Sequence, residues 1–161
     1  MFTATSPDHM PDLETTLSMS GLAFMQAMRD GKISHPPISA LMNYAIEEVD
    51  TGKVVFRGTP EFQHTNPAGG IHGGWYGTLL DSCMSCAVMT VTPRGSAYTT
   101  LEYKVNMVAA IPVGREILAT GTIDHAGRTT CVAHGEIRDA ETSKLYATGS
   151  TTCLIMKLRG D

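Results

Sequence analysis

The sequence predicts an α+β fold in which one long central helix packs against a curled antiparallel sheet of about six strands. Three observations support this prediction. The stretch Gly73 to Pro93 carries one formal charge, at Asp81, as a long buried helix would. Residues 100–107 alternate between polar and apolar side chains, with a period of two, as in a half-buried strand. Short turns join the other predicted strands, which makes neighbouring strands antiparallel.

The N-terminal part of the chain contains a short predicted helix. Residues 1–19 show no clear periodicity, and we expect them to form an extension to a single domain at residues 20–161. Ser20 is a typical N-cap, and the helix it begins runs from Gly21 to Asp30. Gly31 then provides the stop signal.

The predicted strands fall into two groups. Before the long helix, strands at 41–49 and 53–59 flank Asp50-Thr51-Gly52, a good hairpin turn. After the helix, the sequence predicts strands at 100–107, 116–124, 129–138 and 145–156. In the first of these, we expect Leu101, Tyr103, Val105 and Met107 to form the buried face.

The long helix has two distinct faces when its residues are placed at about 100° intervals. The broad apolar face should lie on the sheet and consists of Trp75, Leu79, Leu80, Cys83, Met84 and Ala87. The other face carries small polar residues around one carboxylate, namely Thr78, Asp81, Ser82 and Ser85. A face exposed to water would normally carry Lys and Glu, so this second face predicts a subunit interface that contains Asp81.

The composition excludes several classes of function. The chain has 161 residues, 42% of them hydrophobic, and a net charge of −4, which argues against a nucleic-acid partner. Polar residues within the stretch from Gly73 to Thr92 argue against a membrane-spanning helix, so we expect no membrane partner. The N-terminus lacks the pattern of a signal peptide, and we expect a cytoplasmic protein.

The four cysteines do not predict a metal or redox site. Cys83 and Cys86 form a C-x-x-C pair, but it lies in the middle of the predicted helix rather than at its start. No second pair or suitably spaced histidine completes a zinc site. We therefore interpret both as small buried residues in a reducing compartment and expect no bound metal.

One stretch carries a recognisable motif: Asn66, then His72-Gly73-Gly74, then Asp81 nine residues after His72. With the flanking pattern over about residues 20–156, it resembles the PaaI-type acyl-CoA thioesterases of the hotdog-fold superfamily. The resemblance implies a long helix wrapped by the sheet, homodimers with shared active sites, and dimers of dimers, that is, homotetramers. It implies an acyl-CoA substrate and no separate cofactor, because coenzyme A is part of the substrate.

The chemistry of thioester hydrolysis suits the two central residues of this motif. Negative charge develops on the carbonyl oxygen, and a backbone N–H at Gly73, at a helix N-terminus, would stabilise it. Asp81 would act as general base on a water molecule or as a nucleophile that forms an anhydride, and we favour the general base.

Three further residues have expected roles. Asn66 offers an amide to hold the water or the thioester oxygen, and His72 shapes the turn or contacts the substrate carbonyl. The resemblance implies a Ser or Thr early in the strand after the helix, which Thr100 matches best, whereas Thr99 would point to the opposite face. It also implies that Asn66 and Gly73 come from one subunit, with Asp81 and Thr100 from its partner.

Basic residues should meet the phosphates of coenzyme A. Arg94, Arg115 and Arg128 are candidates, and Arg128 in the turn at Gly127-Arg128 matches a basic position of the family. A solvated turn arginine is the alternative for Arg128.

Other interpretations stay open at this point. The enzyme alternative is a hotdog enoyl-CoA hydratase or dehydratase, and the binding alternative is a non-enzymatic acyl-CoA-binding protein. Asp81 could also be a structural buried carboxylate, and Asn66 before Pro67 could be a plain turn former. A phosphate loop lacks its Gly-Lys-Ser/Thr, and the spacing of His64, His72 and Asp81 is not a recognised metal pattern.

Overall fold

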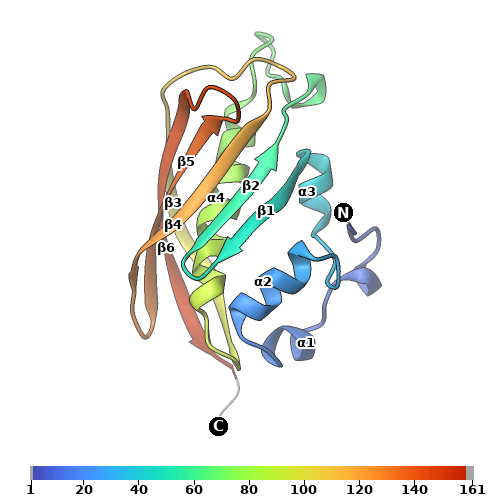
Figure 1. Cartoon of the computed structure of the whole chain (residues 1–161), viewed down its shortest axis with the longest axis vertical. Coiled ribbons are helices and arrows are strands. Elements are labelled where there is room, and N and C mark those ends of the chain that lie inside the picture. The colour runs from blue at the N-terminus through green and yellow to red at the C-terminus, as the bar shows by residue number, and fades with distance from the viewer. Residues whose placement is uncertain (1, 159–161) are drawn as a thin grey trace.

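The computed structural model of the chain describes residues 2–158 and has the predicted α+β architecture (Figure 1). The α-helices are α1 (Leu13–Leu17), α2 (Gly21–Arg29), α3 (Pro37–Leu41) and α4 (Gly73–Val91). Single 3-10 turns lie at Pro7–His9 and Phe62–His64. The strands are β1 (Tyr44–Asp50), β2 (Lys53–Gly58), β3 (Ser96–Met107), β4 (Ile117–Ala126), β5 (Thr130–Asp139) and β6 (Leu145–Lys157).

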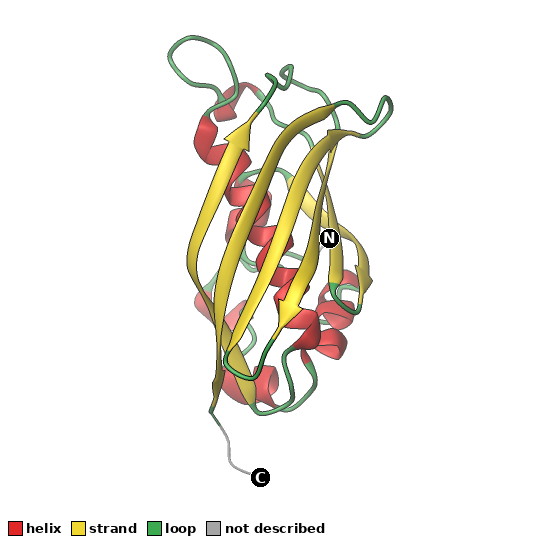
Figure 2. Cartoon of the chain, turned by 90° about the vertical axis from the view of Figure 1, so that its left-hand side faces the viewer, coloured by secondary structure: helices red, strands yellow, loops and turns green. Residues whose placement is uncertain are grey.

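The six strands form one antiparallel sheet in the order β1-β2-β4-β5-β6-β3. Figure 2 shows α4 running along one face of this curved sheet. The chain therefore has the hotdog arrangement, a long central helix wrapped by an antiparallel sheet. β1 and β3 are the two edge strands, so neither has a second neighbouring strand within residues 2–158.

The core lies between α4 and the sheet, as the sequence predicted. The apolar face of α4 is fully buried, and its members are Trp75, Leu79, Leu80, Cys83, Met84 and Ala87. The sheet approaches this helix so closely that glycine is required at Gly121 on β4. A Cβ there would lie 2.1 Å from the backbone oxygen of Cys83. The burial of α4 thus depends on strand residues without side chains as much as on its own apolar face.

The N-terminal region contains more structure than the sequence predicted. The helix after Ser20 is confirmed as α2, with the Ser20 hydroxyl accepting from the Ala23 amide. In the expected extension, α1 is capped by Asp12, Thr3 forms a short parallel bridge with His35, and the adjacent Ala4 is buried. The five-residue helices α1 and α3 were missed because about one turn is too short to show a 3.6-residue period.

The predicted buried face of β3 is only partly confirmed in the single chain, where Val105 is partly buried against the core. Leu101, Tyr103 and Met107 are 56%, 48% and 57% exposed. The strand forms the edge of the sheet, so no further element of the described chain covers these side chains. A register shift between Thr100 and Glu102 also interrupts the alternation on which the prediction rested.

Three of the four cysteines, Cys83, Cys131 and Cys153, are buried in this fold, and Cys86 is partly buried. Burial raises the pKa of the Cys86 thiol to about 12, and it raises the pKa of Cys83 further. None of the four cysteines is in a disulfide. Such thiols are poor nucleophiles at neutral pH, which agrees with the structural interpretation of the C-x-x-C pair.

No helix within residues 2–158 combines the length and the apolar character needed to cross a membrane.

Candidate active site

The N-terminus of α4 presents a backbone N–H, that of Gly73, which donates to no described residue. His72 is the N-cap, and its Nδ1 accepts from the Gly74 amide at 2.9 Å. The Trp75 amide donates to the His72 carbonyl at 2.9 Å. Among the described residues, the Gly73 amide has no hydrogen-bond acceptor. His72 therefore satisfies its neighbour and leaves the Gly73 N–H at the positive end of the helix dipole.

Asn66 organises the loop that precedes this helix. Its Oδ1 accepts from the amides of Ala68 and Gly70, at 2.9 and 3.2 Å. The Asn66 amide donates to the Gly70 carbonyl at 2.8 Å, and Gly69 turns the chain with a φ of +81°. Asn66 is thus a turn former, as one interpretation proposed. Its side-chain Nδ2 donates to no acceptor within residues 2–158, so the same residue still has a free donor.

Asp81 lies on α4 with its carboxylate half-buried and held by one hydroxyl. Thr100 Oγ1 donates to Asp81 Oδ1 at 3.1 Å. Burial raises the pKa of Asp81, and the hydrogen bond from Thr100 lowers it by a smaller amount. Asp81 Oδ2 accepts no hydrogen bond from the part of the chain that the structure describes. A carboxylate with one oxygen anchored and the other free is suited to bind and deprotonate a water molecule.

The structure distinguishes Thr100 from Thr99. Thr100 points to α4, whereas Thr99 is exposed. The register shift after Thr100 places two residues of β3 opposite one residue of β6. As a result Thr100 and Tyr103 both face α4, although they are an odd number of residues apart. Strict alternation would have put them on opposite faces.

The two halves of the expected site lie apart in one chain. Eight residues separate Gly73 from Asp81 on α4, which at about 1.5 Å per residue is roughly 12 Å along the axis. One thioester carbonyl cannot contact both the Gly73 amide and the Asp81 carboxylate across that distance. The chain brings Thr100 to Asp81, and it keeps Asn66 near the start of α4, but it does not join the two pairs.

Uncovered apolar side chains of β3 lie beside this stretch of helix. The Tyr103 hydroxyl is 3.2 Å from where a Cβ on Gly77 would be, and the Met107 sulfur is 3.5 Å from the equivalent point on Gly73. Both side chains are about half exposed in the single chain. Apolar residues at an edge strand, next to an incomplete site, fit a surface that a second chain covers.

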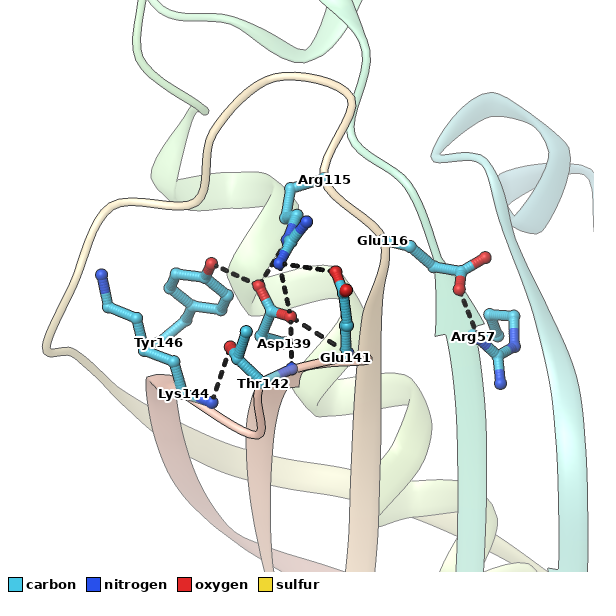
Figure 3. Close-up of polar contacts among 8 residues, drawn as sticks. All are labelled: Arg57, Arg115, Glu116, Asp139, Glu141, Thr142, Lys144 and Tyr146. Carbon is cyan, nitrogen blue, oxygen red and sulfur yellow. Dashed lines mark hydrogen bonds and ion pairs between the residues drawn. The ribbon is translucent and has the colours of Figure 1, made fainter.

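The three candidate phosphate ligands differ in their surroundings. Arg115 is held by Asp139 in a two-pronged ion pair, with Nε to Oδ2 at 2.5 Å and Nη2 to Oδ1 at 3.0 Å (Figure 3). Tyr146 and two turn amides also donate to Asp139. The Arg115 guanidinium, assisted by these bonds, holds the pKa of the Asp139 carboxyl well below its usual range. Arg115 is therefore part of a structural cluster that ties the turn after β5 to the loop before β4.

Arg128 and Arg94 are exposed and make no ion pair with any described residue. The β4–β5 turn that carries Arg128 lies at one end of those strands, and Asp139 lies at the other end. At the Asp139 end, the Gly114 amide donates to the Pro60 carbonyl, which links the loop before β4 to the segment that leads to Asn66. Within one chain, Arg128 is thus remote from Gly73. Its assignment to a coenzyme A phosphate stays a prediction.

The histidines near the motif have backbone partners. His64 Nδ1 accepts from the Glu61 amide at 2.8 Å, and its Nε2 lies 2.7 Å from the Leu41 carbonyl. Both ring nitrogens are thereby occupied, so His64 braces the turn before α4. The described residues contain no cluster of three or more groups that could ligate a metal.

Sequence reasoning missed one polar pair next to the site. Tyr44 of β1 lies with its hydroxyl 2.9 Å from the Ser82 hydroxyl, and burial raises the pKa of Tyr44 to about 12. Ser82 directly follows Asp81, so this tyrosine closes one side of the carboxylate's surroundings. No signal in the sequence links two residues 38 positions apart.

Comparison with known proteins places these features in a family context. The profile of the Thioesterase superfamily matches residues 68–146, the region that holds α4, β3, β4 and β5. Acyl-coenzyme A thioesterase 13 of Mus musculus is 35% identical over 92 residues, which are 57% of this chain and 65% of the mouse protein. The chain thus aligns with just under two thirds of that relative.

Solved structures extend the similarity over most of the chain. Zebrafish thioesterase superfamily member 2 superposes with a TM-score of 0.69 at 28% identity, covering 85% of this chain and 99% of that one. A hypothetical thioesterase from Streptococcus pneumoniae, solved with coenzyme A, gives a TM-score of 0.68 at 29% identity, covering 76% and 93%.

Proposed function

Because the chain belongs to the Thioesterase superfamily, we propose that it hydrolyses acyl-CoA thioesters to a carboxylic acid and free coenzyme A. The observation that carries this proposal is the half-buried Asp81 carboxylate, anchored through one oxygen by Thr100 and free at the other. Acyl-CoA is supported as the substrate class because the mouse relative is an acyl-coenzyme A thioesterase and the Streptococcus structure contains coenzyme A.

In the proposed mechanism, the Gly73 amide donates to the thioester carbonyl oxygen. This N–H has no acceptor among the described residues and points from a helix N-terminus, so it is ready to stabilise the negative charge of the tetrahedral intermediate. Asp81 removes a proton from a water molecule, which attacks the carbonyl carbon. Collapse of the intermediate breaks the C–S bond, and the coenzyme A thiolate leaves and takes up a proton.

Thr100, Asn66 and His72 have supporting roles in this proposal. Thr100 orients the carboxylate so that Oδ2 faces the water. Asn66 offers its free Nδ2 donor to the water or the thioester oxygen. His72 holds the first turn of α4 through its bond to Gly74 and acts as a positioning residue rather than a catalytic one.

The proposed site is shared between two subunits. The separation of roughly 12 Å along α4 prevents Gly73 and Asp81 of one chain from acting on the same carbonyl. A homodimer paired across the β3 edge would cover Tyr103 and Met107 and would bring Asn66 and Gly73 of one protomer to Asp81 and Thr100 of its partner. In the same proposal, two such dimers associate into a tetramer.

Release of free thiol from a panel of acyl-CoAs tests the function directly. The Asp81→Asn variant keeps the size and the Thr100 contact but cannot accept a proton. We expect its kcat to fall by about two to four orders of magnitude, the contribution of a positioned general base. An unchanged melting temperature is the control for folding. Wild-type turnover in Asp81→Asn would refute the mechanism.

A single-turnover experiment, with enzyme in excess and in isotopically labelled water, distinguishes whether Asp81 acts as a general base or as a nucleophile. A general base places the label in the first molecule of product. A nucleophilic Asp81 forms an anhydride, and water attack on the aspartyl carbon leaves the first product unlabelled and the label on Asp81.

A further inference from the structure

A mostly apolar cavity of about 340 Å³ lies between the N-terminal helices and α4. From α2, Phe24, Met25 and Met28 contribute to its wall. The segment from His35 to Ser39, at α3, closes it further, and Figure 1 shows these short helices packed beside α4 and β1. These walls precede residues 68–146, the part of the chain that the family profile matches.

The cavity begins next to the Asp81–Thr100 pair. Ser82 and Ser85 line it, and Ser85 lies one helical turn after Asp81 on the same side of α4. On β3, Tyr98 lines it two residues before Thr100, on the same face of the strand. A group bonded to a carbonyl at Asp81 therefore needs to extend by about one helical turn to enter the cavity.

The polar side chains in the wall are already paired inside the protein. Tyr44 and Ser82 bond to each other at 2.9 Å, and the hydroxyls of Ser39 and Thr16 donate to backbone carbonyls at 2.7 and 3.0 Å. Within residues 2–158, no buried side-chain nitrogen or oxygen lacks a partner. None of the lining residues is Lys, Arg, Asp or Glu. The wall thus offers no charged partner, and a charged group placed there would be desolvated without compensation.

The wall also suits a flexible chain more than a rigid ring. Three methionines, Met25, Met28 and Met89, line the cavity, and their unbranched side chains adjust to an occupant of variable shape. At about 30 Å³ for a water-sized group, 340 Å³ accommodates roughly eleven such groups.

We propose that this cavity takes an unsubstituted aliphatic acyl chain of roughly ten carbons, so that α2 and the segment 35–39 set the chain-length preference. The proposal rests on the acyl-CoA hydrolysis proposed above for the same site. Each methylene that enters the cavity raises kcat/KM by about fourfold, the equivalent of about 0.8 kcal/mol, until the space is full.

The experiment compares kcat/KM for acetyl-, hexanoyl-, decanoyl-, palmitoyl- and phenylacetyl-CoA. We expect decanoyl-CoA to be preferred over acetyl-CoA and over phenylacetyl-CoA. In Ala97→Phe, a ring occupies space at the β3 wall, and displacement of three methylenes lowers the ratio of decanoyl to acetyl kcat/KM by about 60-fold. In Met28→Ala, the cavity grows and the preferred chain becomes longer.

Ala23→Phe is the matched control, because it adds the same ring to an exposed position of α2. It should keep the wild-type chain-length profile. If Ala97→Phe does not fold, as its melting curve would reveal, Met28→Ala still decides the question.

Calorimetric titration with decanoyl-CoA separates the two proposals. Absence of hydrolysis, combined with decanoyl-CoA binding that Ala97→Phe weakens and Ala23→Phe does not, would overturn the proposed function and support the cavity. Hydrolysis with no dependence on chain length, a preference for phenylacetyl-CoA, or equal effects of the cavity and control variants would overturn the cavity assignment and leave the hydrolysis standing.

Discussion

The Gly73→Pro substitution tests the central element of the proposed site, because it removes one N–H and little else. Gly73 is the first residue of α4, where proline is well tolerated. His72 before it has φ −63° and ψ 138°, the extended conformation that a following proline requires. A Cβ at Gly73 meets only the side chain of Met107, at 3.5 Å, which is an ordinary contact. The fold and the helix should therefore survive.

Removal of one donor to a developing oxyanion costs about 100- to 1,000-fold in kcat. We expect a loss of this size for Gly73→Pro in the thiol-release assay, with an unchanged melting temperature. Gly73→Ala is the matched control, since it adds a Cβ but keeps the N–H, and it should remain far more active than Gly73→Pro. Equal activity of the two variants would refute the role of the amide.

The same variant tests whether the site is shared. Gly73→Pro and Asp81→Asn are each inactive alone, but a mixed dimer combines the intact Gly73 of one protomer with the intact Asp81 of the other. After equal amounts are unfolded and refolded together, half of the dimers are mixed and each has one of two sites intact, so about a quarter of wild-type activity should return. No recovery, despite mixed dimers seen by mass spectrometry, would show that each site lies within one chain.

Two further predictions concern the carboxylate and the packing of α4. Because burial raises the pKa of Asp81 and activity needs its ionised form, the acid limb of kcat/KM against pH should lie above the ordinary aspartate value of 3.8. Thr100→Val removes the hydrogen bond that lowers the pKa of Asp81, so the acid limb should move to higher pH. The kcat at neutral pH should fall about tenfold, which is the lower end for a hydrogen bond to a charged group, because Asp81 is only half-buried. An acid limb that does not move would refute the assignment. Gly121→Ala places a Cβ against backbone atoms of α4 and should lower the free energy of unfolding in urea by about 3 kcal/mol or more. Gly135→Ala meets the flexible side chain of Met84 instead, and a loss as large as that of Gly121→Ala would contradict this reasoning.

Much of the fold could be predicted from the sequence because the signals were local. The charge-free stretch around α4 and the short turns between strands specified the order of elements and the antiparallel sheet. The angular analysis of α4 correctly identified six buried residues, but the structure also buries others, among them Tyr76 and Val88, and it buries Ser85, which the analysis had placed on the second face. The short helices α1 and α3 carried no such periodic signal, and they depend on their packing against the rest of the domain.

The candidate site was only partly accessible to the same reasoning. The spacing of Asn66, Gly73 and Asp81 along the chain identified the motif, because residue types and intervals are visible in a sequence. The contact between Thr100 and Asp81 depends on the bulge in β3, which changes the face of every residue after it. The pairing of Tyr44 with Ser82 and the cavity beside Asp81 bring together segments far apart in the chain.

The sequence by itself thus determined the long helix, α2 and the strands, and it identified the candidate residues of the motif, since these follow from local patterns of charge, polarity and glycine. The tertiary structure decided what those residues meet: Thr100 at the carboxylate, an unused amide at Gly73, and an apolar cavity closed by α2 and α3. These depend on strand register and on the packing of distant segments. No local pattern encodes them, because contacts between distant residues arise only when the whole chain folds.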